Sequence, residues 1–167
     1  KVKAMRQPGS TFKLFVYTEA MNQGLTPCDK RRDEYISMQV YDSKKHEMTT
    51  WTPGNANGSF SGDSMALKSA FAKSINSVAV RLGQEMGIKR IIETAHKMGV
   101  DSKLDDTPSL ALGSSDMNLL ELADSYCPVA DNGRHHAPVL VTRIVDRDGK
   151  EVHRAPEDAE QVIPYKS

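Results

Sequence analysis

The sequence predicts an α-rich α+β domain, and three observations support this fold class. Apolar residues recur at helical spacing in several stretches, and glycines follow where those helices are expected to end. A shorter stretch alternates apolar and polar residues, which is typical of a strand. The chain has 167 residues, of which 38% are hydrophobic and 26% charged, so it is long and apolar enough to form one domain with a core.

The first predicted helix runs from Ser10 to about Asn22, and Gly24 ends it. Its core-facing side is formed by Phe12, Phe15, Val16 and Ala20. Residues 25–63 are polar and rich in Gly, Pro and Asn, with one short strand over 36–40. The segment Trp51–Phe60 is expected to be a loop that either borders a cleft or only caps the core.

Further helices are predicted at about 64–73, 75–86 and 88–98, the last with a core stripe of isoleucines. A loop follows over 101–115. Asn118 and Glu121 form a capping box for a helix to about residue 132, whose buried face is Leu119, Leu122, Ala123 and Tyr126 and which Pro128 kinks or ends early. Segments 139–146 and 151–153 are predicted to pair as a hairpin across Asp148-Gly149, and the tail after Pro156 has no pattern.

A Ser-x-x-Lys pair stands at the start of the first predicted helix. Ser10 and Lys13 are three residues apart, so a helix places them on one face. A serine hydroxyl becomes nucleophilic when a neighbouring base takes its proton, and a desolvated lysine can be that base. Ordinary helix capping by Ser10 is the alternative, because Ser after Pro-Gly commonly starts a helix.

A second polar motif, Ser74-Ile75-Asn76, follows an apolar helical stretch. Ser74 falls on the inward side of that helix, where a hydroxyl needs a hydrogen-bond partner. A backbone carbonyl one turn back is one candidate partner, and Lys13 or a substrate amide is the other. Asn76 offers both a donor and an acceptor, which suits an amide ligand.

Together these motifs resemble the penicillin-interacting transpeptidases, whose signature combines Ser-x-x-Lys with a Ser-x-Asn triplet and Lys-Thr-Gly. The residues Arg6–Lys13, Ala70–Val80 and Ser109–Ser114 look like segments of class A, bifunctional penicillin-binding proteins, and the likeness extends from about Ala4 to Val152. The resemblance implies a helical subdomain packed on a five-stranded sheet, with the active site between them and most of that sheet missing here.

Roles for individual residues follow from this resemblance. It implies that Ser10 is the acyl-accepting nucleophile, Lys13 its general base, and Ser74 a proton relay to the leaving amine. Asn76 would bind the acyl side chain of the substrate, and Gly113 would either lie beside the cleft or be a simple turn. The implied reaction is D,D-transpeptidation: attack on the D-Ala-D-Ala end of a peptidoglycan stem peptide, release of D-Ala, and transfer of the acyl group to an amine of a neighbouring stem.

The third motif is absent, because no Lys-Thr-Gly occurs in the 167 residues. We therefore expect residues 1–167 to be an incomplete transpeptidase domain that is inactive alone. The resemblance implies a parent protein that also carries a glycosyltransferase domain and an N-terminal membrane anchor, and that faces the cell wall. A D,D-carboxypeptidase, a serine β-lactamase, a β-lactam sensor and a non-catalytic scaffold are the alternatives. The sequence has no Glu-x-x-x-Asn pattern after Ser74 to supply a β-lactamase's deacylating base.

Composition limits the partners that we expect. Formal net charge is zero, and the basic run Lys30-Arg31-Arg32 is followed at once by two acidic residues, so a solvated loop is expected and nucleic acid is not. The resemblance implies stem peptides, lipid-linked precursors, β-lactams and other cell-wall synthesis proteins as partners. No cofactor is expected.

The two cysteines and the paired histidines are not expected to form a site. Cys28 and Cys127 are predicted to be unpaired. His135 and His136 are neighbours whose side chains point apart in extended backbone, so a surface loop is favoured over a metal site.

Overall fold

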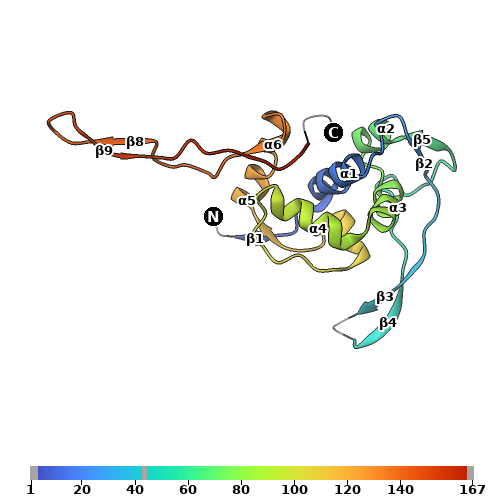
Figure 1. Ribbon diagram of the computed structural model, residues 1–167. Helices are drawn as coiled ribbons and strands as arrows, with labels where there is room; N and C mark the ends of the chain where they lie inside the picture. Colours follow the sequence, from blue (N-terminus) through green and yellow to red (C-terminus); the bar gives the residue numbers. More distant parts are fainter. Residues whose placement is uncertain (1–3, 43–44, 165–167) are drawn as a thin grey trace.

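The computed structural model describes residues 4–42 and 45–164. Its body is a group of short helices around α1, which lies at the centre of the packing (Figure 1). The α-helices are α1 (Lys13–Asn22), α2 (Leu67–Ala72), α3 (Asn76–Met86), α4 (Ile88–Lys97), α5 (Leu119–Asp124) and α6 (Cys127–Ala130), and the 3-10 turns are η1 (Gly9–Phe12) and η2 (Pro108–Leu112).

All strands in the described part of the chain form two-stranded antiparallel pairs, so the five-stranded sheet implied by the resemblance is not present among these residues. The mixture of helices and strands agrees with an α-rich α+β fold. The pairs are β1 (Met5–Arg6) with β6 (Met117–Asn118), β2 (Lys30–Arg32) with β5 (Ser64–Ala66), β3 (Met38–Asp42) with β4 (Glu47–Trp51), β7 (Arg134–His135) with β10 (Glu160–Gln161), and β8 (Arg143–Val145) with β9 (Glu151–Arg154).

The predicted apolar face of the first helix is confirmed. Its four members, Phe12, Phe15, Val16 and Ala20, are all fully buried, and they pack against α3, α4 and η2. The isoleucine stripe of α4 is also confirmed, since Ile91 is fully buried and Ile88 and Ile92 pack against the same core. Burial of the larger, fully buried side chains, those of Phe12, Phe15, Val16 and Ile91, stabilises the fold by about 1.5–3 kcal/mol each.

Two predicted helices have different bounds. The helix expected over 64–73 begins only at Leu67, because residues 64–66 are extended and pair with β2. The basic run Lys30–Arg32 is therefore a strand and not a solvated loop, and the Arg31 guanidinium forms an ion pair with Glu85 at 2.5 Å. The local sequence pattern does not reveal a pairing between segments that are more than thirty residues apart.

The helix expected over 118–132 is split into α5 and α6, with Pro128 in the first turn of α6. The capping box is confirmed, because the Glu121 backbone N–H donates to Asn118 Oδ1 at 2.9 Å. The predicted buried face is wrong for three of its four members: Leu119 is 69% exposed, Tyr126 is 39% exposed and Ala123 is exposed, whereas Leu122 is half-buried and packs against the core.

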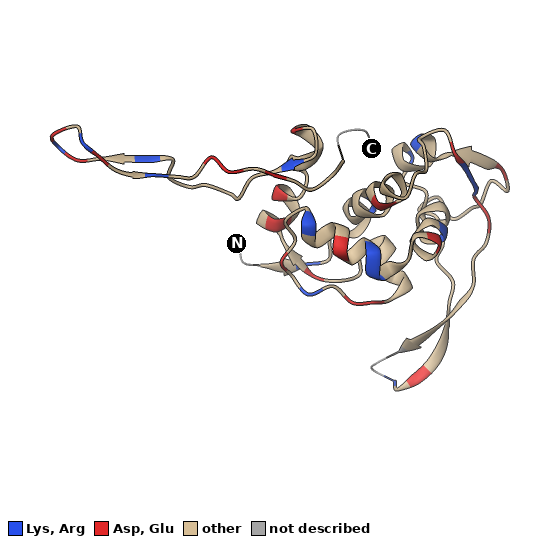
Figure 2. Ribbon diagram, viewed as in Figure 1, with Lys and Arg blue, Asp and Glu red and all other residues tan. Residues whose placement is uncertain are grey.

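Two arms extend from the helical body (Figure 1). One is the β8–β9 hairpin, which confirms the predicted pairing across Asp148-Gly149, and the other is β3–β4. The tail after Pro156, predicted to be without pattern, contributes β10, which pairs with β7. Acidic and basic residues are interspersed along the body and both arms (Figure 2).

Cys28 and Cys127 are both free, as predicted, and both are exposed. His135 lies in a short strand and not in a loop, and its Nε2 is 2.7 Å from Asp124 Oδ2. In the described residues no helix is long and apolar enough to cross a bilayer, and no three His, Cys, Asp or Glu side chains are grouped as metal ligands.

Candidate active site

The Ser-x-x-Lys pair lies where η1 passes into α1. Ser10 is in the 3-10 turn and exposed, whereas Lys13, the first residue of α1, is only 1% exposed. Among the described residues, no hydrogen bond joins the Ser10 hydroxyl to another group. Lys13 directs its amine to a different segment of the chain.

The Lys13 ammonium group contacts three acceptors that all come from the Ser-x-Asn triplet. Its Nζ donates to the Ser74 carbonyl at 2.7 Å, to Ser74 Oγ at 2.9 Å and to Asn76 Oδ1 at 2.6 Å. Burial lowers the pKa of Lys13 from 10.5 to about 8. A lysine with this pKa is neutral in a substantial fraction of molecules near neutral pH, which an exposed lysine is not.

Ser74 lies between α2 and α3 in left-handed backbone, with φ 53°. This conformation costs a non-glycine residue roughly 1–2 kcal/mol. The local hydrogen bonds from the Ser74 and Ile75 backbone N–H groups to carbonyls at the end of α2 stabilise the turn, and Asn76 then begins α3. The reversal turns both the hydroxyl and the carbonyl of Ser74 toward Lys13.

Two residues that the sequence analysis did not select support this turn from behind. Asn55 Oδ1 accepts the backbone N–H groups of Asn76 at 3.0 Å and Ser77 at 3.1 Å. Asn55 Nδ2 donates to Asp33 Oδ1 at 2.6 Å. Both residues lie in the polar stretch 25–63, where no periodic pattern distinguishes them from ordinary loop residues.

The segment around Asn55 also contacts the Asn76 side chain, whose Nδ2 donates to the Gly54 carbonyl at 2.8 Å. The part of Trp51–Phe60 that includes Gly54 and Asn55 therefore lies beside the Ser-x-Asn triplet, although Trp51 itself ends β4. Trp51 also lines a cavity of about 640 Å³ between the β3–β4 arm and residues 105–109.

Gly113 lies against the segment that carries Ser10. Its carbonyl accepts the Gly9 backbone N–H at 3.3 Å, and its φ is 74°. A Cβ at position 113 would lie 2.2 Å from the Gly9 carbonyl oxygen, so the approach of these two backbones requires glycine. The structure thus brings three predicted site residues, Lys13, Ser74 and Asn76, into direct contact. Gly113 contacts Gly9, the neighbour of Ser10 in the chain, and Ser10 itself enters neither contact.

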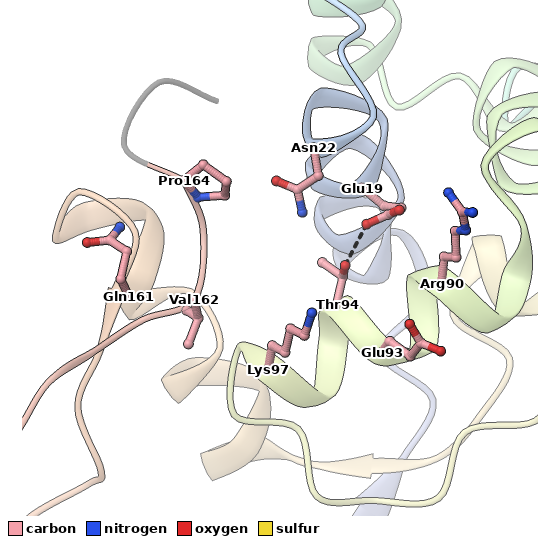
Figure 3. Close-up of a pocket in the computed structure, with 9 residues that line it drawn as sticks. All are labelled: Glu19, Asn22, Arg90, Glu93, Thr94, Lys97, Gln161, Val162 and Pro164. Atoms are coloured by element: carbon pink, nitrogen blue, oxygen red, sulfur yellow. Dashed lines mark hydrogen bonds between the residues drawn. The ribbon is translucent and has the colours of Figure 1, made fainter.

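A second cavity, of about 600 Å³, lies between α1, α4 and the tail (Figure 3). None of its lining residues belongs to the predicted site. The buried Glu19 carboxylate accepts a hydrogen bond from Thr94 Oγ1 at 2.7 Å there, which joins α1 to α4. Gln23 Nε2 donates to the other oxygen of Glu19 at 2.7 Å. Each oxygen of this buried carboxylate therefore accepts a hydrogen bond, and its burial is explained by the structural role of joining these elements.

The buried lysine, the Ser-x-Asn turn that it contacts and the serine one turn before it are the elements of the predicted site, and comparison with known proteins gives the family. The chain belongs to the family described as penicillin binding protein transpeptidase domain, whose model matches residues 1–166.

Individual relatives agree with this assignment. The chain is 31% identical to penicillin-binding protein 2D of Bacillus subtilis over 165 residues, covering 99% of the chain and 23% of the relative. It is 35% identical to penicillin-binding protein 1A of Neisseria meningitidis over 150 residues, covering 89% of the chain and 18% of the relative. The crystal structure of penicillin-binding protein 1A from Haemophilus influenzae superimposes with a TM-score of 0.81 at 28% identity, covering 92% of this chain and 22% of that one. The chain thus spans about a fifth of the length of these relatives.

Proposed function

We propose that this chain provides the acylation half of a peptidoglycan D,D-transpeptidase site, with Ser10 as the nucleophile. The observation that carries the proposal is the buried Lys13 amine, held by the Ser74 hydroxyl and the Asn76 side chain one helical turn from Ser10. The family resemblance supports the same roles. The substrate proposed is the D-Ala-D-Ala end of a stem peptide.

The proton transfers follow from the chemistry of the amine. A protonated Lys13 has three N–H groups, and three acceptors are within hydrogen-bond distance, so it has no free position for a proton from Ser10. A neutral Lys13 has two N–H groups and one lone pair. The Ser74 carbonyl and Asn76 Oδ1 can only accept, so they engage the two N–H groups and leave the lone pair for a hydroxyl.

In the proposed reaction, the neutral Lys13 amine takes the Ser10 proton as Ser10 Oγ bonds to the penultimate D-Ala carbonyl carbon. The carbon–nitrogen bond to the terminal D-Ala then breaks, and the D-Ala nitrogen receives a proton from the Ser74 hydroxyl. The protonated Lys13 gives its proton to Ser74 Oγ in turn. Terminal D-Ala leaves and an acyl-Ser10 ester remains. An amine of a second stem peptide then attacks the carbonyl carbon of that ester. The bond from this carbon to Ser10 Oγ breaks, the amine gives up a proton to Lys13, and Ser10 Oγ regains a proton from Lys13, which leaves the cross-linked amide and the free serine.

β-Lactams would react at the same serine. The attack opens the lactam ring by breaking its carbon–nitrogen bond, and the amine stays attached to the acyl group instead of leaving. A bound β-lactam therefore adds its whole mass to the protein. We extend the proposal to the setting that the resemblance implies, a cell-envelope protein acting on peptidoglycan at the outer face of the cytoplasmic membrane.

The test is intact-mass measurement after incubation with a fluorescent penicillin. It is done on the chain and on the longest natural protein that contains it, each with a Ser10→Ala variant. We expect one added penicillin mass in the longer protein and none after Ser10→Ala. Labelling that survives Ser10→Ala would overturn the proposal, and so would a longer protein that never labels.

The fate of a D-Ala-D-Ala donor peptide distinguishes the alternatives. A transpeptidase converts the acyl-enzyme to a cross-linked product when an amine acceptor is added, whereas a carboxypeptidase gives only the shortened peptide. Rapid recovery of unlabelled protein with hydrolysed penicillin would indicate a β-lactamase. A stable adduct with no turnover of peptide would indicate a sensor.

A further inference from the structure

A buried carboxylate lies behind the Ser-x-Asn turn without a cationic partner. Asp33 is 3% exposed, and its side chain accepts from Asn55 Nδ2 at 2.6 Å, Ser77 Oγ at 2.6 Å and the Ser61 backbone N–H at 3.0 Å. Within the described residues no Lys, Arg or His side chain forms an ion pair with it. Burial opposes its ionisation, but these hydrogen bonds outweigh burial and lower the pKa of Asp33. Asp33 is therefore a carboxylate at neutral pH.

A carboxylate in this position determines which way the Asn55 amide faces. Because Asp33 can only accept, it holds the Nδ2 group of Asn55 and leaves Oδ1 directed at the start of α3. There Oδ1 accepts the backbone N–H groups of Asn76 and Ser77, which have no partner within the helix. Ser77 is held twice, since its hydroxyl also donates to Asp33.

The start of α3 carries the groups that hold the Lys13 amine. Asn76 Oδ1 accepts from Lys13, and the strained turn at Ser74 supplies the other two acceptors. A turn with φ 53° at a serine persists only where its surroundings hold it. Hydrogen bonds therefore connect Asp33 through Asn55 to the backbone of residues 76–77, and the side chain of Asn76 continues the connection to Lys13.

From this chain of contacts we infer that Asp33 is a positioning residue for acylation of Ser10, acting through Asn55 on the acceptors that enclose the Lys13 amine. The inference rests on the proposed function. Asp33 itself contacts neither Lys13 nor Ser10 in this structure. Its effect is to keep the turn closed over the lysine.

The test compares Asp33→Asn with a matched control, Asp63→Asn. Asp63 is exposed and its backbone carbonyl accepts the Asp33 N–H, so its side chain can lose its charge without disturbing the network. Acylation by the fluorescent penicillin is followed in the longest natural protein that contains the chain, from pH 6 to 10. Rates at several penicillin concentrations separate the binding constant from the rate constant of acylation.

Asp33→Asn puts a side-chain N–H₂ group against at least one of the three donors that Asp33 accepts from. We expect the acylation rate constant to fall about 10- to 100-fold, as for other small displacements of a catalytic group, with little change in penicillin binding. Because burial is what lowers the Lys13 pKa, a loosened turn admits water and raises the midpoint of the pH profile toward 10.5. Asp63→Asn is expected to match the parent.

Ser77→Ala is the second variant, in case Asp33→Asn fails to fold. It removes only the hydrogen bond from the Ser77 hydroxyl to Asp33, and we expect a several-fold loss of rate with the same direction of midpoint shift. An unchanged rate in a folded variant would overturn the inference, as would a slower rate with an unmoved midpoint. If the parent labels at Ser10 and both variants label normally, this inference fails while the proposed function stands.

Discussion

Replacement of Gly113 by alanine tests how the segment that carries Ser10 is held. Gly113 has φ 74°, and a Cβ there would lie 2.2 Å from the Gly9 carbonyl oxygen and 2.6 Å from the Gly9 nitrogen. Both contacts are with backbone, so no side chain can rotate away. Either the two segments separate or residue 113 leaves its left-handed conformation.

The expected loss of stability has two parts. Left-handed backbone costs a non-glycine residue about 1–2 kcal/mol. Forcing an extra methyl group into a packed site costs typically about 1–3 kcal/mol. We therefore expect Gly113→Ala to lower the free energy of unfolding by about 2–5 kcal/mol.

Gly24→Ala is a matched control for the first part alone. Gly24 follows α1 with φ 94°, and a Cβ there would meet no atom within 4 Å. Its expected cost is about 1–2 kcal/mol, the backbone term alone. The difference between the two variants measures the clash with Gly9.

Urea unfolding of the chain, followed by far-ultraviolet circular dichroism, gives both values at one temperature. Acylation of Ser10 in the longer protein should also fall more for Gly113→Ala than for Gly24→Ala, because Gly9 adjoins the nucleophile. If the two variants lose the same stability and the same acylation rate, the close contact between residues 9 and 113 does not support the site, and the reasoning is wrong.

Three further predictions concern buried polar groups. Because the pKa of Lys13 is lowered to about 8 and the neutral amine is the base, the acylation rate should rise about tenfold per pH unit below pH 8 and level off above it; a flat stopped-flow profile from pH 6 to 9 would contradict this. In the unfolded chain the pKa of Lys13 is its usual 10.5, so between about pH 8 and 10.5 the unfolded chain binds more protons than the folded one. Lys13 therefore makes the free energy of unfolding rise with pH in that window, and Lys13→Met should remove that slope in urea titrations. Thr94→Val keeps the shape of the side chain but leaves Glu19 Oε2 without its donor, and it should cost about 1–3 kcal/mol in the same unfolding assay, whereas an unchanged midpoint would show that water replaces the hydroxyl.

Local pattern was enough to predict much of the helical body. Helical spacing located α1, α3 and α4, and the capping box at Asn118 located the start of α5. Prediction from local pattern failed where pairing between distant segments decides the conformation. Residues 64–66 have a helical pattern and yet are extended, because pairing with β2 satisfies their backbone groups.

The residues of the candidate site likewise fall into those that could be predicted from the sequence and those that could not. Ser10, Lys13, Ser74, Asn76 and Gly113 could be selected because each belongs to a short motif with a chemical rationale. Asp33 and Asn55 could not, since a loop aspartate and a loop asparagine are ordinary where polar turns are expected. Their importance arises only from burial and from the direction of their hydrogen bonds.

Lys13 shows the physical reason why only part of the site could be predicted from the sequence. Three residues separate Ser10 from Lys13, but the groups that determine whether Lys13 is neutral lie more than sixty residues away at Ser74 and Asn76. Those acceptors would tend to stabilise the ammonium form, whereas burial favours the amine, and burial prevails in setting a pKa of about 8. The basicity of Lys13 is thus a property of how tightly the α2–α3 turn closes over it. A substitution behind that turn should consequently change the chemistry at Ser10 more than a charge change of equal size on the exposed surface beside it.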